Sequence, residues 1–158
     1  MPYRLLVTAV YSADIDDLFA RARSFDELKA AMAGFATYEG IPAGAQAEEG
    51  ATYVVDATLF GWYKVRGHTI HVEHVDLAQR RIQSREHQPG VKRWDHCLTI
   101  APGAHPEEAV WTDDVIIEAG WQSSAIAHMA NSIYRHRHHV RSANQLTSQV
   151  RYARSDAH

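Results

Sequence analysis

The chain has 158 residues, a formal net charge of −3 and a hydrophobic content of 46%, which is typical of one soluble domain with a real core. This charge gives no general attraction to nucleic acid or anionic lipid. Cys97 is the only cysteine, which excludes an internal disulfide and a cysteine-based zinc cluster and favours a reducing compartment. No stretch reaches the roughly 18 apolar residues of a membrane span. The N-terminus also lacks a cleavage site for secretion, so we expect a cytoplasmic protein without stable membrane insertion.

The first 34 residues predict one strand followed by two short helices. Residues 3 to 11 have the pattern of a strand, and Ser12 is placed to cap a helix with an acidic first turn. Ser24 and Glu27 then form a capping-box pattern for a second helix, which Gly34 ends.

The middle of the chain predicts a meander of antiparallel strands. Its segments are rich in Val, Ile, Thr, Tyr and Trp, and turn signals such as Pro89-Gly90 and Pro102-Gly103 separate them. Consecutive strands with short connections pair in antiparallel fashion. The predicted strands are 51–62, 68–76, 80–87, 91–101 and 109–119.

The C-terminal part predicts one long helix and a tail. Residues 122 to 145 lack Pro and Gly, and at about 1.5 Å per residue such a helix spans roughly 35 Å, enough to cross a sheet. Residues 149–158 are polar, so we expect a frayed tail after a single domain of residues 1–148. The apolar residues expected to be buried against the sheet recur at helical spacing: Ile126, Met129, Ile133 and Val140.

This order of elements predicts an α+β fold in which a curved antiparallel sheet of about seven strands grips the long C-terminal helix. A meander with one apolar face needs a cover, and the last helix is the longest candidate. A curved sheet around one helix leaves a cavity, and such cavities are usual sites for small ligands.

Four local sequences resemble those of the START-like helix-grip (SRPBCC) superfamily, in its polyketide cyclase/dehydrase and lipid-transport branch. They are Val10-Tyr11-Ser12-Ala13, Arg93-Trp94-Asp95-His96, Trp111-Thr112-Asp113-Asp114 and Ile133-Tyr134-Arg135-His136-Arg137-His138. The resemblance covers nearly the whole chain and implies the helix-grip fold. The superfamily hosts binders, carriers, cyclases and chaperone regulators, so the resemblance implies no single function, and no member's catalytic residues are carried over.

A histidine on one predicted strand is the main candidate for chemistry. Trp94, His96, Leu98 and Ile100 alternate and therefore share a face, and three large apolar groups around one imidazole indicate that this face points inward. His96 is either a core histidine with one hydrogen bond or a cavity histidine that orients a ligand or transfers protons. The next strand leaves open which face is inward. If His96 lies opposite Asp114, an Asp–His dyad results, and a slip of one residue destroys it.

Arg137 is the second candidate, because it continues the apolar stripe of the long helix. Its charge either reaches water at the end of the cavity or anchors a ligand carboxylate or a nearby aspartate. The residues expected to line a ligand site are Tyr53, Trp94, His96, Leu98, Met129, Ile133 and Arg137. The candidates for catalysis are His96, Asp114 and Arg137.

The other histidines do not predict a metal site. His68, His71 and His74 are split between the two faces of a strand, and His136, His138 and His139 lie among arginines that repel a cation. We interpret them as solvated side chains and expect neither a metal nor another cofactor.

Together these features favour the binding or carrying of a small, largely apolar or aromatic molecule. One alternative is a cyclase or dehydratase in which His96 and an aspartate move protons and Arg137 steadies an enolate. Another is a protein-interaction module that uses the outer sheet face. No obligate catalytic set is recognisable, so binding is preferred over catalysis. No nucleic-acid partner is expected, and a homodimer is left open.

Overall fold

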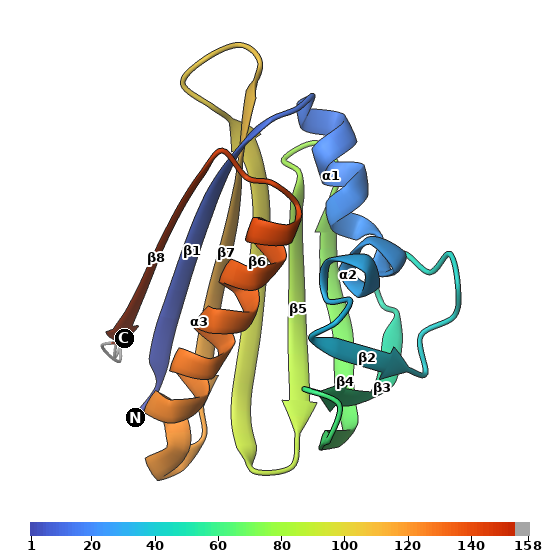
Figure 1. The fold of residues 1–158 in the computed structure, drawn as a ribbon, viewed down its shortest axis with the longest axis vertical. Helices are drawn as coiled ribbons and strands as arrows, with labels where there is room; N and C mark the ends of the chain where they lie inside the picture. Colours follow the sequence, from blue (N-terminus) through green and yellow to red (C-terminus); the bar gives the residue numbers. More distant parts are fainter. Residues whose placement is uncertain (154–158) are drawn as a thin grey trace.

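The computed structural model describes residues 1–153, which form one antiparallel sheet, two short helices and one long helix (Figure 1). Across the eight strands of the described chain the order is β2-β3-β4-β5-β6-β7-β1-β8. The predicted α+β helix-grip architecture is therefore confirmed, with eight strands in place of about seven. The elements are β1 (Tyr3–Ser12), α1 (Ile15–Arg23), α2 (Phe25–Ala31), β2 (Ala36–Glu39), β3 (Thr52–Leu59), β4 (Tyr63–Asp76), β5 (Arg81–Gln88), β6 (Val91–Pro102), β7 (Glu108–Glu118), η1 (Gly120–Gln122), α3 (Ser123–Val140) and β8 (Gln145–Tyr152).

The two short helices after β1 begin at side-chain caps. Asp14, rather than the predicted Ser12, caps α1, because its carboxylate accepts hydrogen bonds from the backbone N–H groups of Asp16 and Asp17. Ser24 caps α2 by accepting a hydrogen bond from the N–H of Glu27 at 3.2 Å, as the capping-box pattern predicted. The two helices pack beside the concave face of the sheet (Figure 1).

The long helix buries a stripe of small residues against the sheet. Ala127, Ala130 and Tyr134 pack with residues of β1 and β7 in one apolar cluster, and the two alanines let the helix approach the strands closely. The predicted stripe lies on a neighbouring face of the helix, beside the face that contacts the sheet. Ile126, Met129 and Ile133 are only half-buried and line a cavity, and the side chain of Val140 is exposed. The burial expected for these four residues was therefore wrong in detail.

The same helix ends earlier than its composition predicted. It ends at Val140 instead of residue 145, because Ser142 takes a left-handed conformation with φ of 63° and the N–H of Ala143 bonds back to the carbonyl of His138.

The segment predicted to fray forms an edge strand instead. β8 pairs with β1 from Val10 opposite Gln145 to Tyr3 opposite Tyr152. Its half-buried residues alternate, and Leu146 and Val150 pack against the same apolar cluster as α3. The other face of the strand is polar, and this polarity is the reason that the composition predicts a tail. The remainder of the predicted tail, residues 154–158, lies outside the described residues.

The packing of α3 gives a direct test of the fold. Ala130→Asp places an unpaired charge in a fully buried position, so we expect the free energy of unfolding to fall by about 4 kcal/mol or more. Ser132→Asp on the exposed face of the same helix is the control and should change stability by less than about 0.5 kcal/mol. Urea unfolding measures both. Equal stability of the two variants would contradict this packing.

Candidate functional site

A cavity of about 290 Å³ lies between the concave face of the sheet, the α1–α2 pair and α3. This volume is at the lower end of the range for ligand sites. Most of its wall is apolar. The strands contribute Val55, Leu59, Ile70, Val72, Ile82 and Leu98, and α3 contributes Ile126, Met129 and Ile133.

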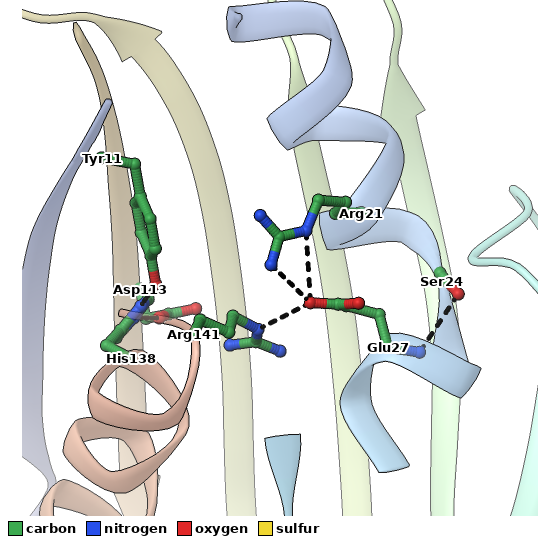
Figure 2. Close-up of polar contacts among 7 residues, drawn as sticks. All are labelled: Tyr11, Arg21, Ser24, Glu27, Asp113, His138 and Arg141. Carbon is green, nitrogen blue, oxygen red and sulfur yellow. Dashed lines mark hydrogen bonds and ion pairs between the residues drawn. The ribbon is translucent and has the colours of Figure 1, made fainter. Parts of the chain in front are cut away.

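One carboxylate joins two histidines at the wall of this cavity. Asp113 Oδ1 is 2.8 Å from His96 Nε2, and Asp113 Oδ2 is 2.8 Å from His138 Nε2. His138 Nδ1 is in turn 2.6 Å from the hydroxyl of Tyr11. Figure 2 shows Tyr11, His138 and Asp113 lying side by side at the end of α3. When His138 is neutral, it donates to Asp113 and accepts from the tyrosine, so a continuous chain of hydrogen bonds runs from β1 to β6.

The strand register selects Asp113, not Asp114, as the partner of His96. β6 and β7 pair with Leu98 opposite Asp113, so His96 and Asp113 are diagonal neighbours on the inner face. Asp114 points to the outer face, where it forms an ion pair with Arg4. The predicted dyad therefore forms with the neighbouring aspartate, and the hypothesis that placed His96 opposite Asp114 was wrong by one residue.

A second carboxylate continues the polar wall towards β4. Glu86 Oε2 is 2.7 Å from His68 Nε2, and Glu86 Oε1 is 3.8 Å from His96 Nδ1. His68 Nδ1 also contacts Gln88 Oε1 at 3.1 Å. The interpretation of His68 and His138 as solvated was wrong, because both belong to this buried network. By contrast, His74 is exposed and pairs with Glu49 at the surface.

The network favours the charged forms of Glu86, Asp113 and His96. Burial raises the pKa values of Glu86 and Asp113, but hydrogen bonds from the histidines outweigh it and hold both well below their usual range. Burial lowers the pKa of His96, but the hydrogen bonds to Asp113 and Glu86 outweigh it and raise that pKa to about 9. At neutral pH His96 is therefore a cation between two carboxylates.

Two arginines of the last helical turns face the same space. The Arg137 guanidinium lies 4.8 Å from the ring of Tyr134, and that of Arg141 lies 4.6 Å from the ring of Trp111. Figure 2 shows Arg141 between the Asp113 cluster and Glu27 of α2, whose Oε1 is 3.7 Å from Arg141 Nε, beyond hydrogen-bond range. Burial and the nearby Arg137 charge lower the pKa of Arg141, so an additional anion would be favourable there.

Several buried donors of the cavity have no acceptor within the described residues. They are Nε of Arg23, Arg137 and Arg141 and Nε1 of Trp94 and Trp111. Buried N–H groups are normally satisfied in folded proteins, so these five suit a ligand rich in acceptor oxygens.

Most of the residues predicted to line a ligand site lie on this cavity. Trp94, His96, Leu98, Met129, Ile133 and Arg137 all line this cavity. Tyr53 does not, because the chain after α2 covers it: its hydroxyl donates to the carbonyl of Gln46 at 3.0 Å and its ring packs on Phe25. Their roles in binding or catalysis stay predictions.

The residues that sequence reasoning missed are polar groups on inner faces. Glu86 follows Ile82 and Ser84 on the inner face of β5, a pattern that polarity alone assigns to solvent. His138 and Arg141 had a usable signal, because with Ala127, Ala130 and Tyr134 they complete a stripe at helical spacing.

Comparison with solved structures confirms the fold class. A START superfamily protein from Mycobacterium smegmatis matches with a TM-score of 0.61 and 12% identity, covering 87% of this chain and 93% of the other. Truncated norcoclaurine synthase from Thalictrum flavum matches with a TM-score of 0.63 and 13% identity, over 92% and 96%. Protein Ms6760 from Mycobacterium smegmatis gives a TM-score of 0.69 and 11% identity, over 87% and 86%.

These likenesses show that the chain has the START-like helix-grip fold, and at such low identity they show the fold alone. No protein-family model matches the sequence. No curated protein matches it either.

Proposed function

We propose that this protein binds a small, largely apolar molecule that carries a carboxylate or a comparable anionic group. The observation that carries the proposal is the combination of an apolar cavity with three buried arginine Nε–H donors that have no hydrogen-bond acceptor in residues 1–153. The cavity side chains of Arg23, Arg137, Arg141 and protonated His96 face the carboxylates of Glu86 and Asp113, and Glu27 outside the lining lies 3.7 Å from Arg141. Positive charge therefore exceeds negative charge, and an anionic ligand would balance the difference.

Useful affinity also requires a polar group in the cavity that anchors the ligand. Burying about 150 Å² of apolar ligand surface contributes about 4 kcal/mol at about 25 cal/mol/Å², before the costs of association are subtracted. A charge-assisted hydrogen bond adds about 1.5–3 kcal/mol, which is a factor of about ten to a hundred in affinity.

A matched pair of ligands tests this proposal. Calorimetry should give micromolar affinity for 2-naphthoic acid and at least tenfold weaker binding of neutral 2-naphthamide. Arg137→Met should remove that preference while leaving the amide within about twofold, because only the acid uses the guanidinium. Leu98→Trp should abolish binding of both by filling the cavity, with thermal stability as the check on folding. Equal loss of acid and amide in Arg137→Met would exclude Arg137 as the anchor.

A second candidate function is acid–base catalysis on a bound carbonyl compound. It is favoured by the chain from Tyr11 through His138 and Asp113 to His96, whose Nδ1 faces the cavity-lining carboxylate of Glu86 at 3.8 Å. Protonated His96 would donate to a carbonyl oxygen while Glu86 accepts a proton from the adjacent carbon, and Arg137 would steady the enolate. The low pKa of Glu86 makes it a weak base, so binding remains the preferred function.

Deuterium exchange separates the two candidates. In D₂O, catalysis would exchange the benzylic protons of phenylpyruvate faster than buffer alone, and His96→Asn would remove that acceleration while the acid still binds. Proton NMR measures the exchange. A wild-type rate equal to that of buffer would contradict the catalytic function and leave the binding proposal intact.

A further inference from the structure

One edge of the sheet is open to a further strand. β8 is the last strand in the sheet order and forms the left edge of the view in Figure 1. Its pairing with β1 runs without a register shift, and its eight residues include neither Pro nor Gly and only one charged side chain, Arg151. Most edge strands are short, bulged or charged, and these features prevent pairing with another chain. The other edge follows this rule, because β2 has only four residues.

The register shows which backbone groups of β8 face outward. Tyr3 pairs with Tyr152, and the N–H of Ala153 donates to the carbonyl of Pro2 at 3.1 Å, so the odd-numbered residues turn their backbone groups towards β1. The even-numbered residues therefore direct their N–H and C=O groups away from the sheet. They are Leu146, Ser148, Val150 and Tyr152. A strand laid along this edge would find donors and acceptors at each of them.

The part of the chain that forms this edge carries no acidic side chain. Residues 119–153, which include α3 and β8, contain no Asp or Glu, although the whole chain has 19 of them. Arg135 and Arg151 are exposed, and neither forms an ion pair within residues 1–153. The edge is therefore locally cationic in a chain whose net charge is −3. No helix in residues 1–153 is long and apolar enough to cross a membrane, α3 beside this edge included.

The two exposed arginines lie on opposite faces of the edge. Arg135 of α3 reaches over the strand, where its Nη1 donates to Ser148 Oγ at 2.7 Å on the half-buried inner face. Arg151 belongs to the alternate set of β8 side chains, which are exposed on the outer face. The side chains of an added strand would alternate in the same way, so acidic residues on either face would meet a guanidinium.

We propose that the β8 edge binds an extended acidic peptide segment of a partner protein, which adds a ninth strand to the sheet. The outward backbone groups of Leu146, Ser148 and Val150 supply the affinity, and the two arginines select acidic side chains. None of these residues lines the cavity, so the interaction goes beyond the proposed ligand binding and does not depend on it.

Fluorescence anisotropy with labelled peptides tests the strand addition. The probe is a blocked peptide of valine, threonine and glutamate, as long as β8, with glutamates on both faces of the extended chain. Wild-type protein should bind it with micromolar affinity, and about tenfold more weakly when lysine replaces every glutamate. Methylation of the alternate backbone nitrogens that face β8 should also weaken binding about tenfold, because strand addition needs those N–H groups.

Two variants separate the backbone groups from the charges. Ser148→Pro should weaken binding about tenfold, because it removes an outward N–H and leaves the pairing with β1 in place. Ser148→Ala keeps that N–H and should bind like wild type. Arg135→Gln/Arg151→Gln should bind the glutamate and lysine peptides equally. Lys64→Gln/Lys92→Gln is the matched control, since it removes the same charge from exposed positions on β4 and β6 and should keep the preference for glutamate.

Thermal unfolding of each variant checks that the domain is folded. The proposal is wrong if wild-type protein binds neither peptide or both equally, or if folded Ser148→Pro binds as well as Ser148→Ala. Should Ser148→Pro unfold, equal binding of the methylated and unmethylated peptides by wild-type protein would overturn it.

Two other occupants would give different results. Binding of a single-stranded oligonucleotide without binding of the acidic peptide, lost in Arg135→Gln/Arg151→Gln and kept in Ser148→Pro, would replace the peptide by nucleic acid. A wild-type dimer that Ser148→Pro converts to a monomer, again without peptide binding, would replace it by a second copy of the chain.

Discussion

Asp113→Asn is expected to lower the free energy of unfolding by about 3–5 kcal/mol, because it removes the carboxylate that two buried histidines share. The amide has one acceptor oxygen, so its NH₂ group would face the N–H of either His96 or His138. The loss of the negative charge also removes the main favourable contact of protonated His96, so the pKa of His96 should fall from about 9. Urea unfolding and an NMR titration of the imidazole measure the two effects.

The neighbouring residue supplies the control for this substitution. Asp114→Asn changes the same chemical group one position away, on the outer face, where the aspartate pairs with the exposed Arg4. An exposed ion pair contributes about 1 kcal/mol at most, so the variant should be close to wild type. A larger loss for Asp114→Asn than for Asp113→Asn would reverse the inferred orientation of β7.

These two aspartates show which features of the site can be predicted from the sequence and which cannot. Strand alternation placed Trp94, His96 and Leu98 on one inward face, and the structure places all three on the cavity wall. Alternation within β7 makes the face of Asp113 the more apolar one, with Trp111, Val115 and Ile117, but an aspartate on each face left the choice open in the prediction. The register with β6 places Asp113 diagonal to His96, and register depends on pairing between strands that a single strand's pattern does not contain.

The buried face of the long helix was also not predicted from the sequence, for a different reason. The helical spacing predicts a buried stripe of large apolar residues, yet Ala127 and Ala130 make the close contact with the sheet. Small side chains carry a weak hydrophobic signal but permit close packing, whereas Ile126 and Met129 face the open cavity. Polar groups such as Glu86 were missed for a related reason, since burial of a charge depends on partners from other strands.

Stability should decline above neutral pH because of the same histidine cluster. The pKa of His96 rises from its ordinary value of 6.5 to about 9 in the folded protein, so the folded state binds this proton more tightly than the unfolded chain. The stabilisation is complete below pH 6.5 and is lost as the pH rises through 9. A pKa shift of this size corresponds to a contribution of about 3 kcal/mol to the free energy of unfolding. His68, whose pKa is also raised, changes stability in the same direction.

Glu86 and Asp113 determine how the stability of the protein changes at acidic pH. The folded-state pKa values of Glu86 and Asp113 are lowered, so their stabilisation is present above the unfolded values near 4 and is lost as the pH falls. Maximal stability is therefore expected between about pH 5 and pH 6.5. The pKa of Tyr11 is raised to about 12, so measurements up to pH 9 do not include its ionisation.

Urea unfolding of the wild-type protein and of His96→Gln at pH 6 and pH 9 tests this expectation. Wild-type protein should lose about 3 kcal/mol between the two values, and His96→Gln should lose less than about 1 kcal/mol because the titrating group is gone. His74→Gln is the control, since His74 is exposed on β4 and should keep the wild-type difference. If His96→Gln and wild type decline equally, the alkaline loss has another origin and His96 is not held as a cation in the wall of the cavity.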